Sequence, residues 1–532
     1  MDAVTTVPTP AAEPARDYAP GSPERARLVR RLDELAGRHT ELPMVIGGRR
    51  RLGGGAVAEP AQPHHHAAKL GVLGAATPAD GQDAVDAALA AGPAWRALSF
   101  DDRAAVFLRA ADLLAGPWRE TLVAATVLGQ SKAVRSAEAD AACGTADAWR
   151  GDVRAARALL AEQPGSGPGG WNRADHRPLE GFVCALSAFD STSAAARSAT
   201  APALLGNTVV WKPAPAQTLA AHFTLRLLEE AGLPPGVVNL VTGDGGAVAG
   251  AVLPHPALAG LHFTGSAAAY RRLWRGIGRD IARYRTYPRL VGAVRGADFL
   301  VAHPSADPAA VRTALVRGAF GFQGQGGAAL SRAHLPRGLW RRIADDLLGE
   351  VDALPVGDPT DLGTFMGALV DARAFDRTVE ALGRAAADPA AELAAGGQHD
   401  AAIGWFVRPT VLLDGAGRHG GSPGPVLSVR LYEDDDWAGA LERAAADSGS
   451  GGPGGPGGSG GGAVFARDRR AVAEALERLR FAADRLRVNG QPSDDRAEPG
   501  RDLARWTSTR SIKETFTPPT DYVHPHMEWS PE

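Results

Sequence analysis

The chain has 532 residues, of which 45% are hydrophobic and 22% are charged, and its formal net charge is −3. This length predicts two or three folded domains, and the composition excludes a small disulfide-stapled scaffold and a wholly disordered chain. The basic residues are scattered, which argues against nucleic acid or an anionic membrane as the main partner. Two cysteines, no apolar run of about 18 residues and no signal-peptide pattern predict a cytoplasmic protein with no membrane span.

The first part of the chain is expected to be mainly helical. Residues 1–25 are rich in Pro, Ala and Ser and predict a loosely attached tail. Leu28, Leu32 and Leu35 then recur at helical spacing, and Ala-rich amphipathic segments follow between residues 80 and 160. A turn-rich stretch over 166–177 ends this helical layer.

From residue 181 onward, short apolar runs alternate with helical patterns. Strands are predicted at NTVVWKP, GVVNLVTG and GLHFTGS, each followed by a helix. This alternation with short links is typical of a parallel, doubly wound sheet, for which a nucleotide is a natural ligand. The alternation restarts at ADFLVAHPSADP and continues to about Val488, which predicts a second α/β domain.

Two later segments have unusual composition. Residues 448–462 read SGSGGPGGPGGSGGG, which predicts a flexible linker and argues against a core strand. The segment from Trp506 to Met527 mixes β-branched and aromatic residues with prolines. It is expected to form an arm that packs on a neighbouring subunit.

Several motifs, in chain order, resemble the aldehyde dehydrogenase superfamily, and most closely its Δ1-pyrroline-5-carboxylate (L-glutamate γ-semialdehyde) dehydrogenase branch. They include APALLGNTVVWKPAP, LLEEAGLPPGVVNLVTGDG, LAGLHFTGS, RYRTYPRLVG and IKETFTPPTDY, within a resemblance that runs from about residue 15 to residue 527. The resemblance implies an aldehyde dehydrogenase-like α/β fold with two doubly wound parallel-sheet domains plus a β-arm for oligomerisation.

The resemblance also divides the chain into parts. These are an N-terminal tail (1–25), an NAD-binding domain with the helical layer (26–292) that carries a hairpin of the oligomerisation arm (165–180), a catalytic-type α/β domain (293–500) that contains the glycine-rich linker (448–462), and a C-terminal oligomerisation arm (501–532). The expected assembly is a homo-oligomer, a dimer or higher, or a mixed oligomer with an active paralogue.

The family's reaction is the NAD-dependent oxidation of L-glutamate γ-semialdehyde to glutamate, the second step of proline breakdown. A cysteine thiolate attacks the aldehyde, while an amide side chain and a backbone N–H hold the oxyanion. Hydride passes to NAD, and a glutamate activates the water that releases the acid. Each role can be compared with this sequence.

The dinucleotide end of the site matches the family. Lys212 in VVWKP corresponds to the lysine that the family places on the adenosine ribose, and FTGS corresponds to the turn beside the pyrophosphate, where helix N-terminal amides suit an anion. NAD is therefore the expected cofactor. The alternative is an ordinary strand-to-helix turn and an exposed lysine. The expected cofactor-binding residues are Trp211, Lys212, Gly243, Gly245, Phe263, Thr264, Gly265 and Ser266.

The reactive end departs from the family. Gly327 stands where the family has its cysteine, Ala293 replaces the general-base glutamate, and Asp190 replaces the oxyanion asparagine. Cys143 and Cys184 do not align with the nucleophile and are expected to be buried apolar fillers. Loss of an oxyanion donor costs about 100- to 1,000-fold in rate, and loss of a covalent nucleophile on the order of a millionfold, in well-studied hydrolases. No catalytic residue of the family is intact.

Other departures point the same way. Gly421 replaces a glutamate that holds the nicotinamide ribose, Ala328 replaces a serine near the substrate carboxylate, and Arg295 replaces a glycine near the nicotinamide. Asp494 and Asp495 would repel an anionic substrate if they line the mouth of the site.

The sequence thus predicts a homologue that is catalytically inactive or severely impaired, with a role in binding, regulation or assembly. Two alternatives stay open. One is an enzyme of altered chemistry in the same cleft, using Asp190, Ser191, Thr192 or Ser331. The other is a non-catalytic structural or interaction subunit, in which Arg295, alone or paired with Asp190, fills the nicotinamide space.

No metal site is expected from the histidine-rich segment. His64, His65 and His66 are consecutive, so they cannot all face one metal from a regular element.

Overall fold

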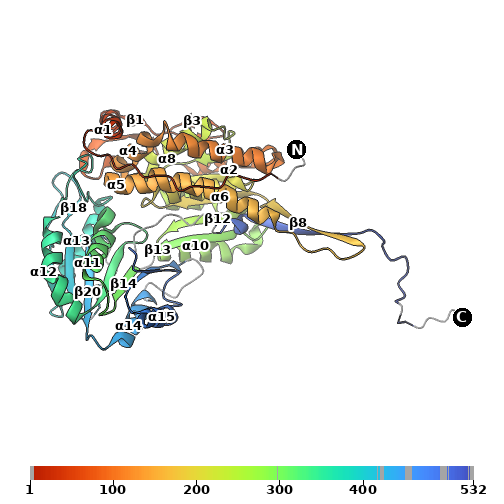
Figure 1. Cartoon of the computed structure of the whole chain (residues 1–532). Helices are drawn as coiled ribbons and strands as arrows, with labels where there is room; N and C mark the ends of the chain where they lie inside the picture. Colours follow the sequence, from red (N-terminus) through yellow and green to blue (C-terminus); the bar gives the residue numbers. More distant parts are fainter. Residues whose placement is uncertain are drawn as a thin grey trace.

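The computed structural model describes residues 5–295, 298–415, 417–419, 424–449, 458–491, 500, 502–524 and 526–527. The chain forms two α/β units, each built on one large sheet, and a layer of helices lies over the first sheet (Figure 1). Both large sheets contain mainly parallel strands, as expected for the predicted fold class. Within the described residues, no helix combines the length and the apolar character that a bilayer crossing requires.

The helical layer begins with capped helices. Ser22 caps the first helix, Thr77 and Asp80 form a capping box at the second, and Ser99 caps the third. A seven-residue π-helix, Glu138–Gly144, connects the last two helices of the layer. The helices of the layer are α1 (Pro23–Ala36), α2 (Pro78–Ala97), α3 (Phe100–Ala115), α4 (Arg119–Gln130), α5 (Val134–Ala137) and α6 (Thr145–Ala161).

The expectation of a loosely attached tail over residues 1–25 is wrong for the part that the structure describes. Glu13 forms ion pairs with Arg119 at 2.6 Å and with Arg150 at 2.7 Å. The hydroxyl of Tyr18 is buried and donates to Glu138 at 2.7 Å. Residues 5–18 are therefore fixed against the helical layer, because polar partners more than 100 positions away hold a segment whose composition suggests mobility.

The first sheet has the strand order β21-β13-β12-β9-β10-β11-β2-β3. Its strands are β2 (Met44–Ile46), β3 (Arg49–Arg51), β9 (Phe182–Ser187), β10 (Thr208–Pro213), β11 (Val238–Leu240), β12 (Leu258–Gly265), β13 (Arg289–Arg295) and β21 (Gly458–Ser459). The connecting helices are α7 (Thr192–Leu204), α8 (Thr218–Glu230), α9 (Gly245–Val252) and α10 (Ala267–Arg279). Strands β13, β12, β9, β10 and β11 run parallel, and β2 and β3 extend the sheet antiparallel.

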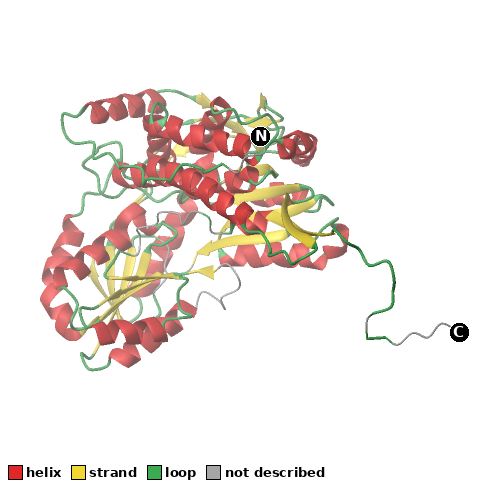
Figure 2. Cartoon of the chain, turned by 45° about the vertical axis from the view of Figure 1, so that its right-hand side comes forward, coloured by secondary structure: helices red, strands yellow, loops and turns green. Residues whose placement is uncertain are grey.

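The second sheet has the order β16-β19-β20-β15-β14-β22-β23, and helices lie on either side of it (Figure 2). Its strands are β14 (Asp298–Ala302), β15 (Leu330–Pro336), β16 (Ala391–Ala395), β19 (Thr410–Asp414), β20 (Val426–Tyr432), β22 (Gly461–Phe465) and β23 (Arg485–Val488). Its helices are α11 (Pro308–Phe320), α12 (Arg337–Ala353), α13 (Ala372–Ala386), α14 (Trp437–Gly449) and α15 (Arg469–Arg478). The boundary expected between residues 292 and 293 falls inside β13, and the chain changes sheets between β13 and β14.

Short strands complete the structure. They are β1 (Thr40–Glu41), β4 (Val57–Ala58) and β7 (Gly71–Gly74) in one sheet, β5 (Ala61–Gln62) with β6 (His65–Lys69), and β17 (His399–Asp400) with β18 (Phe406–Val407).

The glycine-rich linker needs a partial correction. Residues 450–457 lie outside the described residues, but Gly461 and Gly462 are buried and begin β22, a strand between β14 and β23. The amide of Gly461 donates to Asp298 at 2.7 Å, and a Cβ on Gly462 would lie 2.6 Å from the ring of Phe299. The glycines form a core strand here because neighbouring side chains occupy the space that larger residues would need.

The arm consists of two strands from distant parts of the chain. β8 (Gly170–Pro178) pairs antiparallel with β24 (Thr507–Thr515) over nine residues of each strand. Residues 165–180 therefore do not form a hairpin by themselves. Arg173 and Glu514 form an ion pair across the two strands at 2.7 Å. The pair extends away from both units, and the C-terminal segment continues beyond it (Figure 1).

Candidate functional site

The carboxyl edge of the first sheet brings together most of the predicted site residues. β12 lies between β9 and β13, and β10 lies on the other side of β9. In this register Lys212 pairs with Leu186, and Thr264 pairs with Ala293. The segment that carries Asp190 leaves β9 at the same edge. Parallel strands end at one edge, which is where open α/β sheets bind ligands.

Lys212 is buried at the end of β10, with 6% of its surface exposed, so the alternative of an exposed lysine is wrong. Its Nζ lies 3.4 Å from the position that a Cβ on Gly245 would occupy, at the start of α9. Burial lowers the pKa of Lys212 to about 8, and the nearby Asp244 opposes this shift. No side chain or carbonyl among the described residues accepts a hydrogen bond from Lys212 Nζ.

The turn from β12 to α10 is shaped by its own side chains. Gly265 has a φ of +157°, and a Cβ on it would lie 2.7 Å from the ring of Phe263. That ring stacks on Tyr270 at a centroid distance of 5.7 Å. Ser266 caps α10 and accepts from the amide of Ala269 at 3.3 Å. The turn presents the N-terminus of a 13-residue helix beside Thr264, an arrangement that suits an anionic group.

Two other expected cofactor residues have packing partners within the protein. Gly243 has a φ of +107°, and a Cβ on it would lie 2.9 Å from the Cα of Ala75. The indole of Trp211 is buried and donates to the hydroxyl of Ser187 at 3.0 Å. Gly243 therefore permits a close approach of two backbone segments, and Trp211 supports the sheet.

Asp190 and Gly327 lie beside each other. A Cβ on Gly327 would lie 3.2 Å from Oδ2 of Asp190, whose residue is 8% exposed. Ala293 lies one register position before the turn at Gly265, on the neighbouring strand, and is exposed. The structure thus joins two of the three altered positions directly and places the third beside the turn that precedes α10.

The comparisons with known proteins agree with this architecture. The model of the aldehyde dehydrogenase family matches residues 55–484. The chain is 37% identical to mitochondrial Δ1-pyrroline-5-carboxylate dehydrogenase of Mus musculus, in an alignment that covers 97% of this chain and 94% of the relative. This protein belongs to the aldehyde dehydrogenase family.

Solved structures support the same assignment. The Δ1-pyrroline-5-carboxylate dehydrogenase of Mycobacterium tuberculosis is 52% identical and superposes with a TM-score of 0.94 over 100% of both chains. A structure of the same protein bound with NAD has a TM-score of 0.93, over 99% of this chain and 100% of the neighbour. Among the sequence relatives, the Δ1-pyrroline-5-carboxylate dehydrogenase of Agaricus bisporus is also 37% identical, in an alignment that covers 98% of this chain and 97% of that relative. The resemblance inferred from the sequence motifs is confirmed.

In this member of the aldehyde dehydrogenase family, a buried lysine that we did not predict supports the altered site. Lys132 is 3% exposed, and its Nζ donates to Asp140 at 2.6 Å and to the backbone carbonyl of Asp190 at 2.8 Å. The ammonium also lies 4.2 Å from the centre of the Phe322 ring. Lys132 is one of only four lysines in the chain, which is the sequence signal that could have identified it.

The loop before Gly327 has an unusual backbone conformation. Phe322 and Gln323 have φ values of 50° and 55°. The side-chain amide of Gln323 donates to the backbone carbonyl of Ser131, the residue before Lys132, at 2.7 Å. Left-handed backbone at residues other than glycine is uncommon and persists only where surrounding contacts hold it. The loop is thus fixed, although no thiol stands at its end.

The hydroxyl groups considered for altered chemistry have other partners. Ser191 caps α7 and donates to Asp140 at 2.6 Å. Thr192 is buried and lies 2.9 Å from the hydroxyl of Thr126. Ser331 donates to the backbone carbonyl of Asp298 at 3.3 Å. These contacts give each hydroxyl a structural role.

The two cysteines are buried away from position 327. Cys184 lies within β9, and burial raises the pKa of its thiol to about 12. Cys143 lies in the π-helix, where burial and Glu138 raise its thiol pKa to about 11. Cys143 also lies 3.6 Å from the guanidinium of Arg119, so its surroundings are charged rather than purely apolar. Neither thiol lies within 4 Å of the Cβ position of Gly327.

The consecutive histidines do not converge. His64 is buried, with its Nδ1 at 3.2 Å from the hydroxyl of Ser131 and its Nε2 at 3.4 Å from Asp358. Of the residues that the structure describes, no three His, Cys, Asp or Glu side chains gather in a way that could hold a metal ion.

Gly421, Asp494 and Asp495 lie outside the described residues, and so does the side chain of Arg295.

Proposed function

We propose that this protein is a Δ1-pyrroline-5-carboxylate dehydrogenase homologue that binds NAD and has lost the family's oxidation of L-glutamate γ-semialdehyde. The observation that carries this proposal is the pairing of Gly327 with Asp190: where the family has a thiol, a carboxylate lies 3.2 Å from the Cβ position. The branch assignment rests on relatives that bear this name along nearly the whole chain.

The residues at the sheet edge fit NAD. The buried ammonium of Lys212 donates no hydrogen bond to any of the described residues and lies at the start of α9, where it can bind ribose hydroxyls. The N-terminus of α10, with Thr264 and Ser266, can hold a pyrophosphate. A neighbour that is 52% identical has been solved with NAD bound. When bound, NAD supplies a hydride acceptor.

The altered residues remove the other parts of the reaction. Gly327 offers no side chain that can attack an aldehyde, and Ala293 cannot accept a proton from water. Asp190, when ionised, is an acceptor at the position where the family donates a hydrogen bond to the oxyanion. The pairing with Asp190 also means that restoring a cysteine alone would place a thiolate beside a negative charge.

The remaining role is then binding, regulation or assembly in the cytoplasm. The β8–β24 arm extends from the molecule and carries exposed aromatic side chains, including Trp171 and, just beyond β24, Phe516. We assign this arm to contacts in a homo-oligomer or in a mixed oligomer with an active paralogue.

A titration of the purified protein with NAD, followed by an activity assay, tests the proposal. We expect saturable heat of binding, a rise in melting temperature with NAD, and no NADH formation from L-glutamate γ-semialdehyde. NADH formation at an ordinary dehydrogenase rate would contradict the loss of activity. No heat and no thermal shift at about millimolar NAD would contradict cofactor binding and favour a purely structural subunit.

A further inference from the structure

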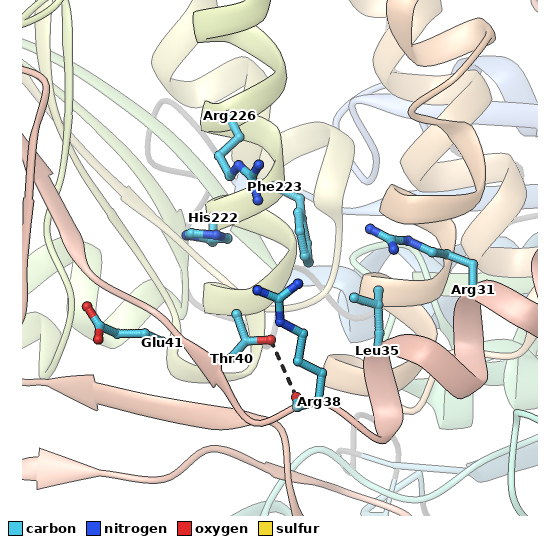
Figure 3. A pocket seen from close by; sticks show the side chains of 8 residues that line it. All are labelled: Arg31, Leu35, Arg38, Thr40, Glu41, His222, Phe223 and Arg226. Atoms are coloured by element: carbon cyan, nitrogen blue, oxygen red, sulfur yellow. Dashed lines mark hydrogen bonds between the residues drawn. The ribbon is translucent and has the colours of Figure 1, made fainter.

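A cavity of 150 Å³ lies between α1, β1 and α8, on elements separate from the Lys212 and Gly327 positions (Figure 3). Leu35 and Phe223 provide apolar walls, and both are buried. Three arginines, Arg31, Arg38 and Arg226, also line the cavity. The lining of the cavity thus combines apolar walls with three cationic side chains.

Acidic side chains neutralise only part of the positive charge of the cavity. Arg38 and Arg226 form no ion pair with any acidic side chain that the structure describes. Arg31 pairs with Glu34 at 2.8 Å. Glu41 is the one acidic residue in the lining, and Figure 3 shows its side chain directed away from the guanidinium groups. An anion could therefore bind without displacing an acidic partner of Arg38 or Arg226.

His222 gives a second, independent indication of a ligand. The residue is 7% exposed, lines the cavity, and its Nδ1 has no hydrogen-bond partner among the described residues. Burial, together with Arg226, Arg50 and Arg38, lowers its pKa to about 4. A buried polar atom without a partner is costly unless water or a ligand satisfies it. The neutral imidazole can carry its proton on Nδ1 and donate it to an acceptor.

The size and walls of the cavity limit the ligand. A cavity of about 150 Å³ holds a molecule the size of benzene. The guanidinium of Arg31 lies 5.9 Å from the centre of the Phe223 ring, so this wall combines an aromatic face with a cation. A ligand that fits must therefore be small, with an apolar body and one anionic end.

We propose that this cavity binds a small organic carboxylate. Its carboxylate lies between Arg38 and Arg226 and accepts a hydrogen bond from His222, and its apolar body packs between Leu35 and Phe223. Arginine is suited to this role because its planar donors match the geometry of a carboxylate. The site is independent of the NAD-binding role proposed above, because none of its residues belongs to that edge of the sheet.

Titration calorimetry of the full-length protein with benzoate at low ionic strength tests this proposal. NAD is present throughout, so that the sheet-edge site is saturated. We expect one saturable site with a dissociation constant of about 1 mM, and at least tenfold weaker binding of the neutral analogue benzamide. No saturable binding of benzoate, or equal binding of benzamide, would overturn the proposal.

A double variant assigns the binding to this cavity. Arg38→Gln with Arg226→Gln changes two exposed residues and is expected to weaken benzoate binding at least tenfold with an unchanged melting temperature. The matched control, Arg272→Gln with Arg341→Gln, removes two exposed arginines that do not line the cavity and should bind like the unchanged protein. Benzoate binding that survives in the first variant, or is lost equally in the control, would overturn the site.

Discussion

Oδ2 of Asp190 lies 3.2 Å from the point where a side chain on Gly327 would begin. The two residues are therefore neighbours, and a substitution at either position changes the surroundings of the other. A thiol introduced at position 327 would therefore lie beside this carboxylate.

The first prediction concerns the acidity of a thiol introduced at this place. In Gly327→Cys, the neighbouring Asp190 carboxylate should raise the pKa of the new thiol, because two like charges disfavour each other. In Gly327→Cys with Asp190→Asn, the pKa should fall by about one unit or more. The rate of iodoacetamide alkylation against pH measures both values. Unchanged protein gives the background of Cys143 and Cys184, which are buried. Equal pKa values in the two variants would show that the carboxylate does not act on this position.

The second prediction concerns Lys212 and separates stability from binding. Burial lowers its pKa from 10.5 to about 8, so the unfolded state binds more protons between these values and the free energy of unfolding rises with pH in that window. At pH 7 the buried charge costs up to about 3 kcal/mol. Lys212→Met should therefore stabilise the protein without cofactor, yet weaken NAD binding at least about tenfold. Urea unfolding and calorimetry measure the two effects.

Lys212→Arg serves as the control for this prediction, because it keeps a positive charge at the same place. It should not stabilise the protein at pH 7. A Lys212→Met variant with unchanged affinity for NAD would remove this residue from the cofactor site.

The third prediction concerns the stability of the protein at acidic pH. His262 is buried in β12, its Nδ1 lies 3.2 Å from the carbonyl of Ser198, and burial lowers its pKa from 6.5 to about 4. The unfolded state therefore binds more protons between pH 6.5 and 4, and the stability that depends on neutral His262 is lost as the pH falls through this window. His262→Gln should reduce the loss of unfolding free energy between pH 7 and pH 5 by about 2 kcal/mol. His399 is exposed, so His399→Gln serves as the control for replacing a histidine that is not buried. Identical acid profiles for His262→Gln and the unchanged protein would contradict this role.

The fourth prediction concerns assembly through the arm. Trp171 is 49% exposed and Phe516 is 61% exposed, near one end of the β8–β24 pair. If they pack on another subunit, Trp171→Ser with Phe516→Ser should reduce the mass measured by light scattering. Phe481→Ser changes a residue that is 97% exposed and lies outside the arm, and should leave the mass unchanged. A monomeric unchanged protein, or an unchanged mass in the double variant, would contradict assembly through this arm.

The fold could be predicted because strands and helices alternate at regular spacing, and the cofactor edge because its motifs are continuous in sequence. Two errors came from composition. The Pro- and Ala-rich composition of the tail predicted loose attachment, because it does not indicate the ion pairs that Glu13 forms with Arg119 and Arg150. The glycine-rich composition of residues 448–462 argued against the strand that the structure contains. Small residues are needed beside Asp298 and Phe299, and this requirement appears only in the folded chain.

Part of the site could not be read from the sequence for a similar reason. Lys132 contacts Asp140, the carbonyl of Asp190 and the ring of Phe322, and these groups come together only in the folded chain. The alignment of motifs identified Gly327 and Asp190 separately. It did not show that they are neighbours, because this contact arises only in the folded chain.

The most direct test is a single-turnover assay, with the unchanged protein in excess over L-glutamate γ-semialdehyde and at an NAD concentration where calorimetry shows binding. We predict no NADH above the rate without protein, because no thiol, general base or oxyanion amide is present at the altered positions. NADH formation at a rate in the usual enzymatic range, about 1 to 10³ s⁻¹, would contradict the account.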